Sequence, residues 1–340
     1  MAGGETVLVT GGSGYIGSWC VVELLKRGHV VRTTVRDLKR EAEVRAAIGK
    51  EVDPGNRLSF HAVDLLRDQG WDEAVAGCDY VLHVASPLGV PVPQHPEQLI
   101  KPAREGALRA VNAAIKAGVK RVVLTSSVAA MYRARSGNWT SDETVWTDGN
   151  DPDVGAYPRS KTLAEQAAWE AIKAANGRTT LATVNPSMVV GPVLSADFSG
   201  SLLVVSRLLS GSVPGLPRIG FSFVDVRDVV DLHLRAMTDP QAAGQRFIAS
   251  KGFAWMSDVA ALLRSGLGQQ AARVPTRRVP DFLVRIVALF DKQLAVVVPG
   301  LGERHEFSSA KAQSMLGWRP RPLEESVVDC AKSLIAFGVV

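Results

Sequence analysis

The sequence predicts an α/β fold with a doubly wound parallel sheet and a smaller, mixed lobe. Short apolar segments rich in β-branched residues alternate with longer segments of helical periodicity through the first half of the chain. A glycine-rich turn joins the first of these strands to the first helix. Strands separated by helices pair in parallel through right-handed crossovers, which is the Rossmann-type arrangement.

The individual elements follow from the spacing of the apolar residues and from the glycines that end helices. Short apolar runs predict strands at 6–10, 30–35, 58–63, 80–84, 121–125 and 180–184. Apolar residues at helical spacing predict helices at 15–27, which ends before Gly28, at 97–117, which ends before Gly118, and at 157–175.

The second half of the chain has a different pattern. Glycine, proline and serine become frequent over 186–220, which is typical of a loop or lid, and the remainder is mixed and helix-rich. We therefore expect a dinucleotide-binding domain at 1–185, rejoined by about 223–249. The segments 186–222 and 250–340 are expected to form a substrate-binding lobe.

Composition excludes several classes of protein. The 340 residues are 46% hydrophobic and 21% charged, with a formal net charge of +5 spread along the chain, so we expect no nucleic-acid partner. The cysteines have no metal-binding spacing, which predicts no metal site and a reducing compartment. The most apolar late segment, 282–301, is interrupted by charges and a proline, and the first residues do not resemble a signal peptide. We expect a cytoplasmic protein without a membrane segment.

The first turn has the spacing of a phosphate-binding loop. The first strand leads into Thr10-Gly11-Gly12-Ser13-Gly14-Tyr15-Ile16-Gly17, with Gly11, Gly14 and Gly17 three residues apart. Glycines permit the tight turn, the approach of the backbone to a pyrophosphate and the close packing of helix on strand. The N–H groups at the helix start then face the phosphates. We expect Tyr15 and Ile16 to contribute to this cofactor site.

The end of the second strand distinguishes NADP from NAD. An acidic residue there holds the ribose of NAD, whereas a basic residue accepts the 2′-phosphate of NADP. The sequence has Arg36 at this point, followed by Asp37, Lys39 and Arg40. We therefore expect NADP(H), bound by Arg36 and Lys39. Two alternatives remain: Asp37 takes the role found in NAD enzymes, or Lys39 and Arg40 only begin a solvated helix.

Further candidates follow the next strands. Asp64 and Leu65 come after the third strand, where Asp64 either accepts from the adenine amino group or caps a turn. Ala85 follows the fourth strand and Thr125 ends the fifth, at the edge of the sheet where ligands bind. His83, at the end of the fourth strand, is expected to be a packed histidine and not a catalytic one.

Tyr157 and Lys161 form the expected catalytic pair. They lie four residues apart at the start of a predicted helix and so share one face. A free tyrosine has a pKa near 10, and a neighbouring ammonium lowers that pKa. The pair can deliver a proton to a carbonyl oxygen while a hydride arrives at the carbon. The alternative is that a helix holds a tyrosine and a lysine at this spacing without function.

Ser127 completes the expected centre. It follows the fifth strand in Leu124-Thr125-Ser126-Ser127, upstream of the tyrosine. A hydroxyl there can donate to a substrate oxygen and position it against Tyr157. Serines at a strand end also simply begin turns.

With these residues in view, the whole chain resembles the extended short-chain dehydrogenases/reductases. Within them it looks most like the branch of dihydroflavonol, cinnamoyl-CoA and aldehyde reductases. The resemblance rests on Val9-Thr-Gly-Gly-Ser-Gly-Tyr-Ile-Gly-Ser18, Thr34-Val-Arg-Asp37, Thr125-Ser-Ser127, Tyr157-x-x-x-Lys161-Thr-Leu-Ala-Glu-Gln-Ala-Ala-Trp169, Asn185-Pro186, Val189-Val-Gly-Pro192 and Phe223-Val-Asp-Val-Arg-Asp228.

The resemblance implies specific roles for these residues. Ser127 would orient the carbonyl group, Tyr157 would donate the proton, and Lys161 would hold the nicotinamide ribose. It implies that Arg36 binds the 2′-phosphate. Pro186 and Ser187 would line the nicotinamide.

Two departures from the family's patterns bear on the substrate. Dihydroflavonol reductases carry an asparagine five positions after the catalytic serine, where this chain has Tyr132. Cinnamoyl-CoA reductases carry Asn-Trp-Tyr-Cys-Tyr-Gly-Lys around the tyrosine, where this chain has Val154-Gly-Ala-Tyr-Pro-Arg-Ser-Lys161. We therefore expect a less specialised aldehyde or ketone reductase for a small hydrophobic or aromatic carbonyl compound. Tyr132 and Leu194 are the candidate substrate contacts.

Other readings remain at this point. A sugar-nucleotide epimerase or dehydratase would keep the same three residues with tightly held NAD, and a 3β-hydroxysteroid dehydrogenase would favour oxidation. A non-catalytic NADP-sensing regulator would lose the tyrosine or the lysine, and this chain keeps both. The sequence leaves open whether the protein is a monomer or a homodimer.

Overall fold

The structure is a computed structural model that describes residues 4–87, 95–133, 136–151, 154–196, 200–290 and 298–340. Its centre is a seven-stranded sheet in which all neighbouring strands are parallel. The order across the sheet is β3 (Leu58–Ala62), β2 (Val30–Val35), β1 (Thr6–Thr10), β4 (Tyr80–His83), β5 (Arg121–Thr125), β7 (Thr180–Pro186) and β10 (Arg246–Ala249). This confirms the predicted doubly wound parallel sheet.

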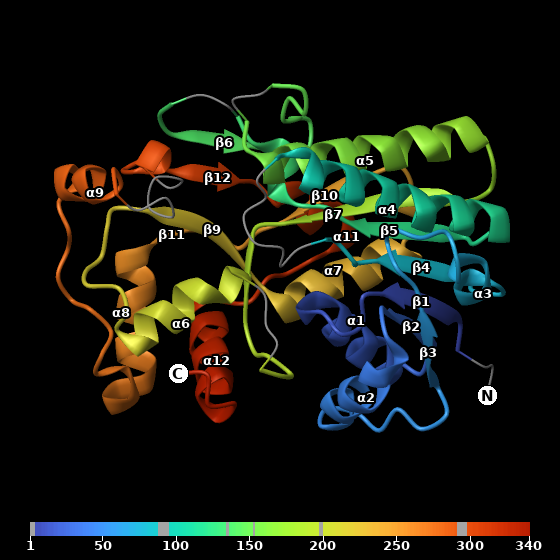
Figure 1. Cartoon of the computed structure of the whole chain (residues 1–340), viewed down its shortest axis with the longest axis horizontal. Helices are drawn as coiled ribbons and strands as arrows, with labels where there is room; N and C mark the ends of the chain where they lie inside the picture. The colour runs from blue at the N-terminus through green and yellow to red at the C-terminus, as the bar shows by residue number, and fades with distance from the viewer. Residues whose placement is uncertain (1–3, 88–94, 134–135, 152–153, 197–199, 291–297) are drawn as a thin grey trace.

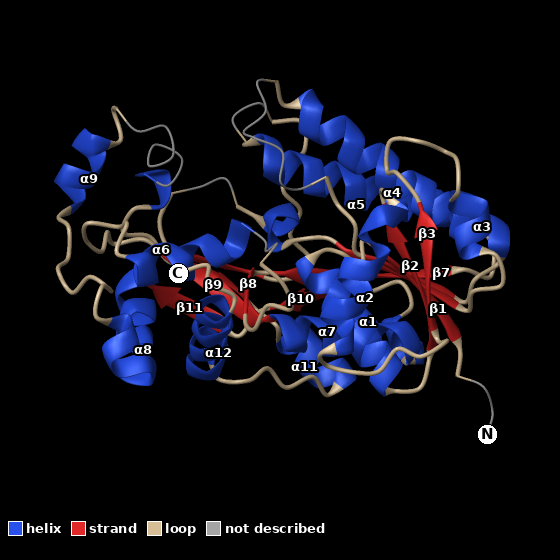
Figure 2. Ribbon diagram, turned by 60° about the horizontal axis from the view of Figure 1, so that its bottom comes forward, coloured by secondary structure: helices blue, strands red, loops and turns tan. Residues whose placement is uncertain are grey.

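Helices cover both faces of the sheet (Figure 1 and Figure 2). On one face lie α3 (Trp71–Val75), α4 (Glu97–Ala117) and α5 (Ala156–Ala175). On the other lie α1 (Tyr15–Lys26) and α7 (Val226–Thr238), with α2 (Glu41–Gly49) beside α1. Leu8 and Val122 pack with Val111 of α4, whereas Val9 packs in the core that contains Val229 of α7. The strands β1 and β5 are almost entirely buried and rich in valine and leucine, because helices cover both of their faces.

The strand order places a ligand crevice at the carboxyl end of β1. Chain connections run outward in opposite directions from β1, which pairs with β2 on one side and with β4 on the other. In open α/β sheets such a switch point is where ligands bind, beyond the carboxyl ends of the strands. The loops after β1, β4, β5 and β7 therefore surround the candidate site.

A second, mixed lobe adjoins the sheet and holds the C-terminus (Figure 1). Its strands form a three-stranded sheet and a parallel pair: β8 (Met188–Val190), β9 (Gly220–Asp225) and β11 (Gly252–Trp255), then β6 (Trp139–Ser141) and β12 (His305–Phe307). Its helices are α6 (Leu203–Ser210), α8 (Met256–Leu267), α9 (Asp281–Val287) and α12 (Leu323–Ala336). The helix α11 (Ala310–Leu316) packs against β10 and α7. We propose the expected division at 1–185 with 223–249, against 186–222 with 250–340, because β10 and α7 return to the main sheet. Two short strands cross this boundary, since β6 pairs with β12 and the end of β9 pairs with β11 in the second lobe.

One expectation is wrong in part. The segment 186–220 was expected to be a loop or lid, but it contains β8 and α6. The apolar side chains Val205, Leu208 and Leu209 bury one face of α6, and Gly211 ends it at a φ of 71°. The surrounding glycines and serines dominate the composition, whereas the burial of a few apolar residues decides the local structure.

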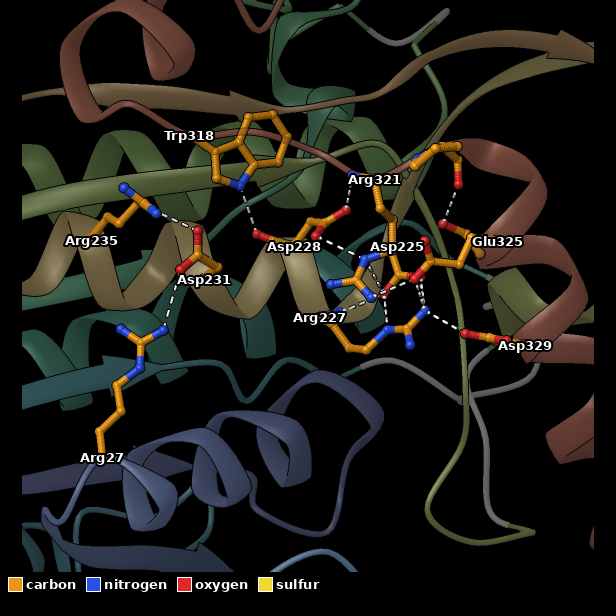
Figure 3. Close-up of polar contacts among 12 residues, drawn as sticks. Arg27, Asp225, Arg227, Asp228, Asp231, Arg235, Trp318, Arg321, Glu325 and Asp329 are labelled. Atoms are coloured by element: carbon orange, nitrogen blue, oxygen red, sulfur yellow. Dashed lines mark hydrogen bonds and ion pairs between the residues drawn. The ribbon is translucent and has the colours of Figure 1, made fainter.

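A buried ionic network joins α7 to the C-terminal helix (Figure 3). Asp225 is 1% exposed and accepts from Arg227 through Nε and Nη2, both at 2.9 Å. The same guanidinium lies 2.9 Å from Asp329 in α12. Arg321 pairs with Asp228 at 3.0 Å. Removing one partner of such a buried pair typically costs about 3–5 kcal/mol, so this network fixes the C-terminal helix to the sheet lobe.

Candidate active site

The three candidate catalytic residues meet at the carboxyl end of the sheet. Ser127 directly follows β5, and Tyr157 and Lys161 lie in the first turns of α5. The side chains of Ser127 and Tyr157 are hydrogen-bonded to each other. The Lys161 ammonium is 6.0 Å from the centre of the Tyr157 ring. The structure thus brings together residues that are up to 34 positions apart in the sequence.

Tyr157 carries its proton at neutral pH. The residue is 36% exposed, but its hydroxyl end is desolvated, and this burial raises the Tyr157 pKa while the hydrogen bond from Ser127 opposes the increase. The expectation that Lys161 lowers the Tyr157 pKa is not met in this structure. The reason is geometric, because the Lys161 Nζ donates to Ser86 Oγ at 3.1 Å and not to the tyrosine.

Lys161 is buried and poised to lose its proton slightly above neutral pH. It is 6% exposed, and desolvation lowers its pKa to about 8 while the charge of Glu165 opposes that decrease. A small cavity adjoins it. The cavity lining combines polar groups with small apolar ones: His83, Ala85, Ser86, Ala103, Ala107, Leu124, Thr125, Ser126, Ala164 and Glu165.

The two neighbouring serines have different partners. Ser126 Oγ donates to Glu165 Oε2 at 2.5 Å, so its proton is engaged inside the protein. Ser127 Oγ accepts from Ala129 N at 3.1 Å, as a turn-capping hydroxyl does. A hydroxyl that accepts from the backbone keeps its own proton for donation. Ser127 is therefore the serine suited to hold a substrate oxygen.

The glycine loop has the geometry that a pyrophosphate requires. Gly11 adopts a φ of 73°, and Gly14 N donates to Gly11 O at 2.9 Å to close the turn. A Cβ at Gly17 would lie 2.2 Å from Gly11 O, so α1 can approach the loop this closely only with glycine there. A cavity lies over the loop between α2 and residues 193–195.

Tyr15 and Ile16 turn their side chains away from this loop. Tyr15 Oη donates to Gly191 O at 2.8 Å inside the protein, and Ile16 packs against the core. These two residues are therefore placed to contribute backbone N–H groups at the helix start.

The residues after β2 favour a phosphate over a ribose hydroxyl. Asp37 Oδ1 accepts from Lys39 N at 3.0 Å and so caps the 3₁₀ turn Leu38–Arg40. Arg36 is exposed and makes no hydrogen bond or ion pair with the described residues, which leaves its guanidinium available. Of the two cations beyond it, Arg40 lines the glycine-loop cavity, whereas Lys39 is exposed outside that lining.

The two candidate adenine contacts, Asp64 and Leu65, both have side-chain contacts within the protein. Asp64 Oδ1 accepts from Leu66 N at 2.9 Å, which is the turn-capping alternative. Leu65 packs against α4, where a Cβ on Gly106 would lie 2.9 Å from the Leu65 Cβ. One carboxyl oxygen of Asp64 has no such backbone partner, so contact with adenine stays a prediction.

Thr125 and His83 are held by internal hydrogen bonds. Thr125 Oγ1 lies 2.6 Å from His233 Nε2, and the other ring nitrogen of His233 lies 2.8 Å from Val229 O. Burial lowers the pKa of His233 to about 4, so the ring is neutral and Thr125 donates to it. His83 is buried, bonded to Thr10 Oγ1 at 2.8 Å, and its pKa is lowered to about 3, which fits a packed histidine.

The remaining cofactor candidates border the same crevice. Ala85 lies against Gly11, where an added Cβ would be 3.1 Å away, and Ala85 lines the cavity beside Lys161. Pro186 is buried at the end of β7. Ser187 Oγ donates to Ala249 O at 3.2 Å.

The two candidate substrate contacts lie apart. Tyr132 belongs to an aromatic cluster, with its ring 5.1 Å from Trp139 and 5.6 Å from His305. Leu194 lines the glycine-loop cavity and packs in the core, so the structure places it on the phosphate side. The apolar side chains of Met131, next to Tyr132, and of Leu202 are fully buried in the core.

Sequence reasoning missed Ser86, Glu165 and Arg246. Glu165 has no exposed surface and pairs with Arg246 at 2.7 Å. A signal was present, because Glu165 follows Lys161 by four residues and so shares its helical face. Arg246 carried no comparable signal, since it is 81 positions away and meets Glu165 only through the pairing of β10 with β7.

The described residues contain neither a helix suited to span a membrane nor a cluster of metal ligands. None of the helices in the described ranges combines the length and apolar character that crossing a bilayer requires. Within the same ranges, no group of three or more histidine, cysteine or acidic residues is arranged to hold a metal ion.

Comparisons with known proteins agree with this geometry. Residues 7–249 match the model of the NAD dependent epimerase/dehydratase family. The chain is 34% identical over 337 residues to cinnamoyl-CoA reductase CAD2 of Medicago truncatula, covering 97% of this chain and 96% of that protein. It is 33% identical to dihydroflavonol 4-reductase of Gerbera hybrida, covering 76% and 72%.

A solved structure is similar over nearly the whole length. Yeast methylglyoxal/isovaleraldehyde reductase Gre2, complexed with NADPH, superposes with a TM-score of 0.80 at 26% identity, covering 98% of this chain and 99% of that one. The chain therefore belongs to the NAD dependent epimerase/dehydratase family, the extended short-chain dehydrogenases/reductases, in the branch of the dihydroflavonol and cinnamoyl-CoA reductases.

Proposed function

We propose that this protein is an NADPH-dependent carbonyl reductase that converts an aldehyde or ketone into an alcohol. The observation that carries the proposal is the hydrogen-bonded pair Ser127–Tyr157, with Lys161 beside it, at the carboxyl edge of a sheet whose first loop suits a pyrophosphate. The similarity to a reductase solved with NADPH supports the choice of cofactor.

Each residue has a distinct role in the proposed reaction. Bound NADPH supplies the hydride that adds to the carbonyl carbon. Ser127 donates a hydrogen bond to the carbonyl oxygen and orients it, and Tyr157 transfers its proton to that oxygen. Lys161, protonated at neutral pH, turns from Ser86 toward the nicotinamide ribose and stabilises the tyrosinate left behind.

The cofactor's phosphates meet the basic and glycine-rich part of the chain. The backbone at Gly11, Gly14 and Gly17 would hold the pyrophosphate at the N-terminus of α1. Arg36, which is exposed, would hold the 2′-phosphate, with Lys39 nearby in the chain. Ala85, Pro186 and Ser187 would border the nicotinamide, and Thr125 would do so without its hydroxyl, which bonds to His233. Asp64 and Leu65 would border the adenine.

Arg36→Ala is expected to weaken NADPH binding and to leave NADH binding almost unchanged. A hydrogen bond to a charged group is worth roughly 1.5–3 kcal/mol, which corresponds to about 10- to 150-fold in Kd. The effect shrinks as salt rises because Arg36 is exposed. Titrations of both cofactors by fluorescence measure it, with Arg178→Ala, an exposed arginine at the other end of the sheet, as the control. Equal losses for both cofactors would assign Arg36 to the fold or to the adenine.

We further propose that the substrate is a small or medium hydrophobic carbonyl compound, aromatic in character, and not a dihydroflavonol or a CoA thioester. At position 132, where dihydroflavonol reductases carry an asparagine, this chain has a tyrosine ring that ends in a single hydroxyl. The Tyr132 ring packs with Trp139 and His305, and this aromatic cluster favours an apolar partner.

The substrate class is tested by a comparison of kcat/KM. We expect benzaldehyde-type aldehydes and aryl ketones to exceed dihydroquercetin and feruloyl-CoA, with NADPH and NADH absorbance followed in parallel. A hydrogen-bonding site discriminates strongly against substrates that lack its partner, so the ranking is informative. An advantage for either plant substrate would overturn the substrate proposal and leave the reduction itself standing.

A further inference from the structure

A buried carboxylate lies one helical turn beyond the candidate catalytic pair. Tyr157, Lys161 and Glu165 follow one another at intervals of four residues in α5, so they project from one face of the helix. Glu165 has no exposed surface. Its charge raises the Lys161 pKa, against the burial that lowers that pKa to about 8. The protonation of Lys161 therefore depends on Glu165.

Glu165 accepts hydrogen bonds from two strands of the central sheet, β7 and β10, and from Ser126, which follows β5. Oε1 accepts from Arg246 Nε at 2.7 Å and from Thr183 Oγ1 at 3.0 Å. Oε2 accepts from Ser126 Oγ at 2.5 Å and from Asn185 Nδ2 at 2.9 Å. A carboxylate accepts on both oxygens in this way when it is ionised. The negative charge is thus held at a fixed point behind Lys161.

Two of these partners, Ser126 and Asn185, also connect Glu165 to Ser127. Ser126 precedes Ser127 in the chain, and the Asn185 amide that donates to Glu165 also donates to Ser127 O at 3.2 Å. Glu165 therefore restrains the backbone that carries the Ser127 hydroxyl. A shift of that backbone would move the hydroxyl away from Tyr157.

The charge of Glu165 is balanced by Arg246, which also binds the loop after β6. Arg246 Nη1 donates to Glu143 O at 2.9 Å and to Val145 O at 3.0 Å, and its guanidinium stacks 3.5 Å from the Trp146 ring. The pair Glu165–Arg246 links α5 to the loop after β6.

The other charged groups around the pair act more weakly on Lys161. His83 of β4 faces Lys161, but its pKa of about 3 keeps it neutral. The charge of Lys311 in α11 interacts with Glu143 and Arg246. Glu165 is the acidic residue whose charge acts on Lys161.

We infer that Glu165 is a positioning residue for the proposed reduction: its charge keeps Lys161 protonated, and its hydrogen bonds hold the Ser126–Ser127 backbone against Tyr157. This inference rests on the proposed function. An ion pair that only stabilised the fold would change the melting temperature and leave the titration of Lys161 where it is.

The test is the pH dependence of Glu165→Gln. Loss of the negative charge lowers the Lys161 pKa, so the lysine loses its proton at a lower pH. The alkaline limb of kcat/KM for the carbonyl substrate should move down by roughly one pH unit. The Kd of NADPH should begin to weaken at a correspondingly lower pH, which is a readout without turnover.

Three further variants separate charge from stability. Glu165→Asp keeps the charge and should keep the wild-type limb, even if kcat falls. Asp228→Asn breaks another buried carboxylate–arginine pair, with Arg321, and should lower the melting temperature without moving the limb. If Glu165→Gln does not fold, the double variant Glu165→Gln/Arg246→Met leaves no unpaired buried charge and should still show the shift.

The outcomes distinguish this inference from the proposed function. A Glu165→Gln limb that coincides with the wild-type limb, or one that moves equally in Glu165→Asp, overturns the inference. Retention of wild-type turnover by Tyr157→Phe overturns the proposed function instead.

Discussion

Tyr157→Phe is expected to lose turnover by about 10²–10⁴-fold while NADPH still binds, because in the proposed reaction the phenol is the group that protonates the carbonyl oxygen. Burial raises the Tyr157 pKa, so the proton is present throughout the neutral range. The phenylalanine ring occupies the same space and removes only the hydroxyl. Single-turnover measurements of NADPH oxidation give the effect on the chemical step, and cofactor fluorescence gives the binding.

Two comparisons sharpen this result. Tyr80→Phe removes a hydroxyl at the amino end of β4, away from the site, and should keep kcat. Lys161→Ala should also nearly abolish turnover, since it removes the cation beside the tyrosine. A wild-type kcat in Tyr157→Phe would contradict the assigned proton donor.

Ser127→Ala is expected to lower kcat by about 10²–10³-fold, the cost of removing one donor to a reacting oxygen. Ser126→Ala should retain far more activity, because its hydroxyl proton is already donated to Glu165. The loss of that internal bond should cost about 1 kcal/mol of unfolding free energy. Parallel kinetics and thermal denaturation of the two variants separate the roles. The reverse ranking would place the catalytic hydroxyl one residue earlier.

The central sheet was predictable because its strands are buried on both faces. Such strands are rich in apolar and β-branched residues, and the predicted segments 6–10 and 30–35 coincide with β1 and β2. The short strands of the second lobe were not predictable in this way. β6 and β12 have three residues each, and Trp139 pairs with His305 only after the chain has crossed both lobes.

The same difference between local patterns and distant contacts applies to the residues of the candidate site. The glycine loop and the pair Tyr157–Lys161 are local patterns, and sequence spacing alone places each on its element. Contacts between segments that are far apart in the chain have no local sequence pattern that could predict them. Thr125 was expected to face the cofactor, yet its hydroxyl meets His233, which is 108 positions away. Ser86 likewise became a partner of Lys161 only through the juxtaposition of β4 with α5.

The late return of the chain to the central sheet has a consequence for synthesis on the ribosome. Domains fold from the N-terminus as they emerge. Glu165 emerges well before Arg246, which supplies its cation from the last strand of the sheet. Arg227 in turn awaits Asp329 near the C-terminus. A chain released early would therefore carry buried charges without their counterions, and prematurely terminated fragments should be degraded rather than accumulate as partly active reductase.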